Sequence, residues 1–244
     1  MIAAIADGSL SMFDLNVNKV SVMQWREHKR EACSVDNNHV MRDKFLSTSY
    51  DGSLKIWTVS SKMSMQTLQG HEGIVYQGRW SSREATALIT VGADRTVRLW
   101  DDRTAGGLIK TIFAHENEIL SVDWNPKSGL QFVTGSSDMS IRVWDWRHIG
   151  TPMNVLRGHQ RAVRRVKWSP MTGNIYSVGY DMTMRVWGLN SLNPLVGMWE
   201  GHTEFVTGVD VDPIGGRVAT CAWDQSIHLL HPIHYGQLSS YNVI

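Results

Sequence analysis

The chain has 244 residues, of which 42% are hydrophobic and 19% charged, and its 24 lysines and arginines nearly balance its 23 aspartates and glutamates. This composition is typical of a folded globular protein, and it excludes a disordered charged tail and a protein that binds nucleic acid through bulk charge. No basic segment precedes the short apolar stretch at the N-terminus, so we expect no signal peptide, no membrane span and an intracellular location. Cys33 and Cys221 form no CxxC pair, which argues against a disulfide framework or a thiolate metal site.

The first predicted element, residues 1–24, contains a turn aspartate followed six residues later by an aromatic residue, and this pair recurs through the chain. The aspartates stand 43 or 44 residues apart, and the last five each follow a histidine by 22 or 23 residues and a serine or threonine by four. The sixth residue after the aspartate is Phe13, Trp57, Trp100, Trp144, Trp187 or Leu230. Markers that stay in step over five periods indicate an internal repeat.

The repeat divides the chain, as a single domain, into the partial unit 1–24 and five full repeats. The full repeats are residues 25–68, 69–112, 113–156, 157–199 and 200–244. Within each repeat, short runs of alternating apolar residues end at Gly, Asn-Pro, Ser-Pro or Asp-Pro, as in Ile119–Trp124 before Asn125-Pro126. No segment has sustained helical periodicity, so we predict an all-β fold with about four short strands per repeat.

A repeat of this length, with Gly-His early and Trp-Asp late, resembles the WD-repeat family. Trp100-Asp101 and Trp144-Asp145 carry the complete dipeptide. The resemblance implies a β-propeller with four antiparallel strands in each blade, here five full repeats plus a partial N-terminal blade. Because closing the ring leaves few exposed strand edges, we expect this sequence to be an N-terminally shortened form of a seven-bladed protein.

The recurring His, Ser or Thr, and Asp resemble the parts of a nucleophilic triad. Five equivalent copies argue against catalysis, and the family resemblance implies instead a buried polar network that joins these residues to the Trp. The predicted network residues are His28, Ser47, Asp51, Trp57, His71, Thr90, Asp94, Trp100, His115, Thr134, Asp138, Trp144, His159, Ser177, Asp181, Trp187, His202, Thr220 and Asp224. With no Walker loop, dinucleotide turn, HExxH or GxSxG motif in the sequence, we expect no enzyme.

Two other groups of residues could suggest ligands. One basic residue stands two positions before the Trp in each of four repeats, so blade architecture accounts for this set: Lys55, Arg98, Arg142 and Arg185. A second set forms a basic cluster that we interpret as solvated or partner-facing, with no nucleic acid bound: Arg161, Arg164, Arg165 and Lys167. His228, His231 and His234 have the spacing HxxHxxH, but a spacing of three in a strand places side chains on opposite faces. We therefore expect surface or turn histidines, no metal and no cofactor.

Specific strings resemble one branch of the family, the peroxin-7 receptors for the type 2 peroxisomal targeting signal. They are Glu27–Asp36 (EHKREACSVD), Ala114–Trp124 (AHENEILSVDW), Gly158–Pro170 (GHQRAVRRVKWSP), Gly201–Asp210 (GHTEFVTGVD) and Cys221–His228 (CAWDQSIH). The chain departs from the pattern at Asn37, where a Trp would end the strand, and at Leu230-His231. The resemblance implies a non-enzymatic cytoplasmic receptor that shuttles to the peroxisome without inserting into membranes. It would bind cargo proteins with an N-terminal signal Arg/Lys, Leu/Val/Ile, five variable residues, His/Gln, Leu/Ala, together with an import co-receptor.

In WD propellers, binding residues occupy the third and fifth positions after the His and the position before the turn Asp. The predicted peptide-binding residues from this rule are Glu31, Tyr50, Ile74, Tyr76, Glu118, Leu120, Arg164, Tyr180, Phe205 and Trp223; Cys33, Ala93, Ser137, Ala162 and Thr207 complete the set. Carboxylates pair with cations and aromatic rings supply apolar contact area. We expect Glu31 and Glu118 to hold the cargo cation.

Two alternative functions stay open at this point. Trp100–Arg103 and Trp144–Arg147 both fit the WDxR pattern of substrate adaptors of cullin-type ubiquitin ligases. An arginine after Trp-Asp also suits a strand that must turn with a polar residue. The third possibility is a generic assembly scaffold.

Overall fold

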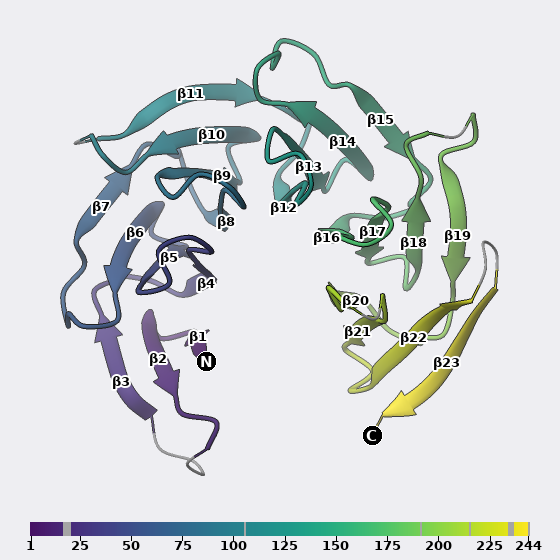
Figure 1. Cartoon of the computed structure of the whole chain (residues 1–244), viewed down its shortest axis with the longest axis horizontal. Helices are drawn as coiled ribbons and strands as arrows, with labels where there is room; N and C mark the ends of the chain where they lie inside the picture. Colours follow the sequence, from purple (N-terminus) through teal and green to yellow (C-terminus); the bar gives the residue numbers. More distant parts are fainter. Residues whose placement is uncertain (17–20, 105, 191, 215, 234–236, 244) are drawn as a thin grey trace. The chain divides into compact units, whose positions relative to one another are not determined.

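The computed structural model describes residues 1–16, 21–104, 106–190, 192–214, 216–233 and 237–243, with side chains up to residue 231. These residues form 23 β-strands (Figure 1) and pack as two compact units, Met1–Ile119 and Leu120–Ile244. In the part of the chain that the structure describes, no helix is long and apolar enough to cross a bilayer.

The first unit contains three antiparallel sheets whose strands pair in chain order. The first sheet has β1 (Ile2–Ala4), β2 (Ser9–Phe13) and β3 (Ser21–Arg26). The second has β4 (Ala32–Asn37), β5 (Lys44–Ser49), β6 (Ser53–Thr58) and β7 (Gln66–Gln69), and the third has β8 (Val75–Trp80), β9 (Ala87–Gly92), β10 (Thr96–Asp101) and β11 (Leu108–Phe113). Among the residues that the structure describes, the first sheet has three strands where the other two have four, as expected for a partial blade.

The second unit contains three four-stranded antiparallel sheets, again paired in chain order. They are β12 (Ile119–Trp124), β13 (Gln131–Ser136), β14 (Ser140–Asp145) and β15 (Asn154–Arg157); β16 (Val163–Trp168), β17 (Ile175–Gly179), β18 (Met184–Trp187) and β19 (Leu195–Trp199); and β20 (Val206–Val211), β21 (Val218–Ala222), β22 (Ile227–Ile233) and β23 (Gln237–Val243). Strand β12 begins one residue before this unit. One sheet for each full repeat confirms the predicted all-β fold class. The repeat boundaries and the seven-bladed parent stay predictions.

The turn between the second and third strands of each four-stranded sheet explains the recurring aspartate. In the third sheet, Asp94 Oδ1 accepts a hydrogen bond of 3.1 Å from the backbone N–H of Thr96, and Arg95 donates its N–H to the carbonyl of Gly92 at 3.3 Å. The residue after the aspartate has a positive φ, which is 80° at Gly52 and 63° at Arg95. A short polar side chain that caps its own turn favours such a hairpin.

Tryptophan supplies much of the core, which accounts for its abundance. Trp57, Trp100 and Trp187 lie on third strands and are at most 1% exposed, and Trp80 and Trp168 end first strands and are at most 2% exposed. In the first unit Trp80 of β8 packs with leucines of the preceding sheet, so it joins two sheets. Large apolar rings at sheet junctions bury much area per residue.

Candidate functional site

Each predicted polar network centres on a buried hydroxyl. In the fourth repeat, Ser177 Oγ lies 2.7 Å from His159 Nε2 and accepts a 2.8 Å hydrogen bond from Trp187 Nε1. Asp181 Oδ2 lies 2.8 Å from Nδ1 of the same histidine. A histidine that donates from Nδ1 to the carboxylate leaves Nε2 to accept from the serine, so every polar group here has a partner.

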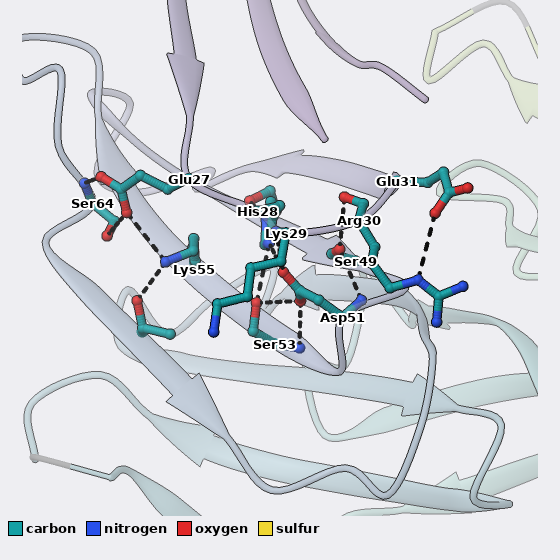
Figure 2. Close-up of polar contacts among 12 residues, drawn as sticks. Glu27, His28, Lys29, Arg30, Glu31, Ser49, Asp51, Ser53, Lys55 and Ser64 are labelled. Atoms are coloured by element: carbon teal, nitrogen blue, oxygen red, sulfur yellow. Dashed lines mark hydrogen bonds and ion pairs between the residues drawn. The ribbon is translucent and has the colours of Figure 1, made fainter. Parts of the chain in front are cut away.

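The contact between histidine and hydroxyl recurs in the first, second and fifth repeats, and the bond from tryptophan to hydroxyl recurs in the first, second and third. Histidine Nε2 and the hydroxyl oxygen lie 2.6 Å apart for His28 and Ser47, 2.7 Å for His71 and Thr90, and 2.9 Å for His202 and Thr220. The indole N–H donates to the hydroxyl over 2.8 Å for Trp57 and Ser47, 2.8 Å for Trp100 and Thr90, and 3.1 Å for Trp144 and Thr134. Nδ1 lies 3.3 Å from Asp51 in the first repeat and 2.8 Å from Asp224 in the fifth. Figure 2 shows His28 and Asp51 of the first repeat together with Ser53.

The surroundings of the network keep the aspartate charged. Burial alone would raise the pKa of Asp51, but hydrogen bonds from Ser53 and from the backbone N–H of Lys29 outweigh it and lower the pKa to about 2. Burial likewise opposes, but does not cancel, the effect of His159 on Asp181, whose pKa is also lowered to about 2. Burial lowers the pKa of His28 more than its carboxylate partner raises it. In the first repeat, a neutral His28 and a charged Asp51 are therefore the favoured pair at neutral pH.

The network is arranged for stability. The hydroxyls of Ser47, Thr90 and Ser177 belong to residues that are 0% exposed. Each of these hydroxyl oxygens also accepts a hydrogen bond from an indole N–H. Buried polar groups with full sets of partners specify one packing of a core.

The first repeat differs from the second and fourth at two positions together: the glycine before the histidine and the arginine two residues before the Trp. In the second and fourth repeats, a Cβ on Gly70 or Gly158 would lie 2.7 or 2.8 Å from the guanidinium of Arg98 or Arg185. The first repeat has Glu27 at the glycine position and Lys55 at the arginine position. Lys55 Nζ donates to Glu27 Oε2 at 3.1 Å, and Ser64 also donates to this carboxylate (Figure 2).

The fifth repeat departs furthest from the pattern, and it corrects one expectation. Leu230 is buried where other repeats have Trp, and Trp199 of β19 packs edge-on against His202, with ring centroids 5.2 Å apart. His228 lies 4.9 Å from the Trp199 ring and is only 9% exposed, so the prediction of a surface or turn histidine was wrong for this residue. His228 stands two residues before Leu230, the position that a lysine or arginine occupies in the other repeats, and its ring fills the space beside the network there. His231 is half-buried and His234 lies outside the described residues.

The described residues contain no group of three or more His, Cys, Asp or Glu that could hold a metal ion. The two described cysteines, Cys33 and Cys221, form no disulfide bond in the structure.

The proposed peptide-binding positions lie together because the backbone joins them. The residue before the turn aspartate donates its N–H to the carbonyl of the third residue after the histidine. These bonds run from Tyr50 to Glu31 at 2.9 Å, from Ala93 to Ile74 at 2.9 Å, from Tyr180 to Ala162 at 3.0 Å and from Trp223 to Phe205 at 3.1 Å. The rule read from the sequence therefore selects neighbouring side chains within each repeat.

In the first unit, four of these residues form an acidic–aromatic cluster: Glu31, Tyr50, Tyr76 and Glu118. The two tyrosine rings meet edge to face with centroids 6.3 Å apart, and Tyr76 Oη donates to Glu118 Oε2 at 3.0 Å. Burial and this hydrogen bond both raise the pKa of Tyr76, which keeps the phenol protonated as a donor. Arg30, which the sequence rule did not select, places its guanidinium carbon 5.9 Å from the centre of the Tyr50 ring and its Nε 3.9 Å from Glu31.

In the second unit, three residues form an aromatic cluster: Tyr180, Phe205 and Trp223. Ring centroids lie 4.9 Å apart for Tyr180 and Phe205 and 5.2 Å apart for Phe205 and Trp223. Trp223 is 62% exposed, which is high for a residue of this size. Tyr180 and Phe205 are half-buried, so Trp223 is the exposed member of the cluster.

The remaining predicted binding residues are less accessible. Ile74 and Arg164 are half-buried, and Leu120 is only 7% exposed, so its side chain offers little surface to a ligand. Of the basic cluster, Lys167 forms an ion pair of 3.1 Å with Asp210 on the next sheet.

The sequence reasoning missed a set of contacts between neighbouring sheets. Asp36 at the end of β4 accepts hydrogen bonds from the backbone N–H of Trp80 at 2.8 Å and from Arg79 Nη1 at 2.6 Å, both on β8. In the second unit Asp123 accepts from the N–H of Trp168 at 2.8 Å. The sequence Ser-Val-Asp occurs in both β4 and β12, and this shared motif is the signal that could have indicated the contacts.

The two WDxR motifs have a local structural role. Arg147 donates to both carboxylate oxygens of Asp145, at 2.9 Å through Nε and 2.6 Å through Nη2, and Arg103 engages Asp101 in the same way. The arginine thus folds back on its own Trp-Asp dipeptide, and this geometry does not favour the adaptor alternative.

Comparisons with known proteins agree with this geometry. The model of the family described as WD domain, G-beta repeat matches residues 19–58, 62–101, 106–145, 150–188 and 193–230. The chain is 41% identical over 68 residues to the peroxisomal targeting signal 2 receptor of Saccharomyces cerevisiae, covering 28% of this chain and 18% of that protein. It is 31% identical over 104 residues to the receptor of the same name in Schizosaccharomyces pombe, covering 42% and 34%. It is 39% identical over 67 residues to peroxisome biogenesis protein 7 of Arabidopsis thaliana, covering 27% and 21%.

The matched stretches span less than two thirds of each of these relatives. The family model, in contrast, covers most of this chain in five consecutive repeats. Its repeats contain the polar networks and the four-stranded sheets described above. The chain therefore belongs to the WD-repeat family.

Proposed function

We propose that this chain is a cytoplasmic receptor that binds the N-terminal type 2 targeting signal of cargo proteins and delivers them, with an import co-receptor, to the peroxisome. The names of the matched relatives support the signal class. The observation that carries the proposal in this chain is the carboxylate of Glu118, held by Tyr76 beside two tyrosine rings on an exposed surface.

The acidic–aromatic cluster has the chemistry to receive an arginine or lysine. A carboxylate held in place by a neighbouring donor makes a charge-assisted hydrogen bond to a guanidinium without first losing side-chain freedom. Tyrosine faces add cation–π attraction. Arg30 already places a guanidinium near the Tyr50 ring, so the cluster accommodates this group within the chain itself. The cation at the start of the targeting signal is the proposed ligand of Glu31 and Glu118.

The aromatic cluster has the chemistry to receive the apolar positions of the signal. Tyr180, Phe205 and Trp223 supply flat rings with few rotatable bonds, of which Trp223 is exposed and the other two are half-buried, and such residues dominate the affinity of many interfaces. A segment with leucines spaced along one face would bury these leucines on the rings. Binding of this kind needs no chemical step, in keeping with a non-enzymatic role.

The proposal is tested by titrating a fluorescent peptide, Arg-Leu-(five residues)-His-Leu, with the protein and following its anisotropy. Glu118→Gln removes the charge and keeps the shape, and we expect it to weaken binding about tenfold, as for the loss of one charge-assisted contact. Glu84→Gln is the matched control, since Glu84 is exposed in the loop between β8 and β9. Failure of the unchanged protein to bind the peptide would refute the function, and equal binding by Glu118→Gln would refute the site.

A further inference from the structure

Arg30 places its side chain against two residues of the acidic–aromatic cluster. Its guanidinium carbon lies 5.9 Å from the centre of the Tyr50 ring. Its Nε lies 3.9 Å from Glu31 Oε2, a contact drawn in Figure 2. A planar guanidinium beside a carboxylate and over an aromatic ring is also the arrangement that the cluster offers to an arginine of the targeting signal. An arginine of the chain therefore holds the place proposed for the cargo cation.

The repeat does not require an arginine at this position. Arg30 is the second residue after its histidine, and the counterparts in the other repeats are Gly73, Asn117, Arg161 and Glu204. In the second unit Tyr180, which has the position of Tyr50, packs its ring on Phe205. The contact of Arg30 is therefore set by the residues of its own cluster and not by the turn that all repeats share.

The main chain of Arg30 is held in place, whereas its side chain is exposed. Ser49 Oγ donates to the Arg30 carbonyl oxygen at 3.2 Å, and a Cβ added to Gly8 would lie 2.6 Å from the same oxygen. The side chain is 63% exposed. Exposed ion pairs and exposed cation–π contacts are weak. The guanidinium can therefore leave the cluster without disturbing the fold.

A peptide arginine gains more in the cluster than Arg30 does. The ion pair of Arg30 is with Glu31, over 3.9 Å. Tyr76 holds a second carboxylate in the cluster, that of the exposed Glu118, through its 3.0 Å hydrogen bond. A cation that is attracted by both carboxylates outcompetes one that relies on a single long contact. Repulsion between the two guanidinium groups then drives Arg30 into solvent.

We propose that Arg30 is a specificity-determining residue that competes with the first cation of the targeting signal for the acidic–aromatic cluster. The inference rests on the proposed function and adds to it a competitor within the chain. A peptide cation takes over the contacts of Arg30 with Tyr50 and Glu31. A neutral residue at the same place in a peptide cannot do so, and the competition therefore acts on the cation alone.

The test combines Arg30 variants with two peptides. Arg30→Gln removes the guanidinium, and we expect it to bind the fluorescent Arg-Leu-(five residues)-His-Leu peptide about three- to tenfold more tightly than the unchanged protein, as for the loss of a weak competing contact. The same peptide with Gln in place of the first Arg should bind both proteins equally. Lys29→Gln is the matched control, since it removes one positive charge from the neighbouring exposed residue. It should change the affinity for the Arg peptide by less than about twofold.

An NMR experiment follows the contact itself. The Nε–Hε resonance of Arg30 is assigned by its absence from the spectrum of Arg30→Gln. Removal of the ring in Tyr50→Leu should shift this resonance. Saturation of the unchanged protein with the Arg peptide should shift it in the same direction, because the guanidinium leaves the ring.

Each outcome decides the inference. Tighter binding of the Arg peptide by Arg30→Gln but not by Lys29→Gln supports it. Equal tightening in Lys29→Gln overturns it, because the effect is then one of overall charge. Unchanged or weaker binding by Arg30→Gln, or an Arg30 resonance that the saturating peptide leaves in place, overturns it while the proposed function stands. If neither the unchanged protein nor Arg30→Gln binds the peptide, the proposed function fails, and the inference fails with it.

Discussion

Removing the hydroxyl at the centre of one polar network should destabilise the second unit strongly. In Ser177→Ala, the indole N–H of Trp187 loses the acceptor at 2.8 Å and Nε2 of His159 loses the partner at 2.7 Å. Ser177 is 0% exposed, so water does not replace the oxygen. A buried polar group without a partner costs about 1–3 kcal/mol, so two such groups predict a loss of about 2–6 kcal/mol. In a chain of this size, that loss lowers the melting temperature by about 4–24 °C.

The equivalent residue in the second, third and fifth repeats is threonine, which provides a matched rescue. Ser177→Thr keeps the hydroxyl, and we expect it to retain most of the stability. Urea denaturation followed by far-UV circular dichroism measures the free energy of unfolding and, through its slope, checks that the unfolded state is unchanged. A Ser177→Ala protein as stable as the unchanged one, or a Ser177→Thr protein as unstable as Ser177→Ala, would refute the network account.

Two further predictions concern charge. The pKa values of Asp51 and Asp181 are lowered to about 2, so these charged groups add stability above their ordinary pKa near 4, and this stability is lost as the pH falls towards 2. Urea denaturation at a series of pH values should show this loss, and the free energy of unfolding should change less with pH in Asp181→Asn than in the unchanged protein. The same pH dependence in both proteins would show that the aspartate is not involved. Asp36→Ala should cost about 2–4 kcal/mol, and more than Arg79→Ala, because Asp36 also holds the N–H of Trp80; a double-mutant cycle showing independent effects would contradict the contact.

The spacing of the sequence was enough to predict the sheets and the networks. Each network uses residues at fixed distances within one repeat, such as His159, Ser177 and Trp187, so the phase of the repeat places them together. The same phase placed Trp223 beside Phe205, since the backbone bond from the Trp223 N–H to the Phe205 carbonyl lies within the fifth repeat.

Contacts between repeats could not be predicted in the same way. The burial of His228 depends on Trp199, which belongs to the strand before the fifth repeat's own histidine and stands outside the repeat markers. Asp36 pairs with Arg79 on the next sheet, whereas the equivalent pair in the second unit, Lys167 and Asp210, has its charges reversed. The sequence rule chose Leu120 by position alone, and the direction of its side chain into the interior is set by packing.

A charge exchange between protein and peptide tests the central claim most directly. The claim is that Glu118, held by Tyr76, reads the cation of the targeting signal. Glu118→Arg should weaken binding of the Arg-Leu-(five residues)-His-Leu peptide by at least about tenfold. It should bind the same peptide with Glu in place of the first Arg more tightly than the unchanged protein does. Preference of both proteins for the same peptide would contradict the claim.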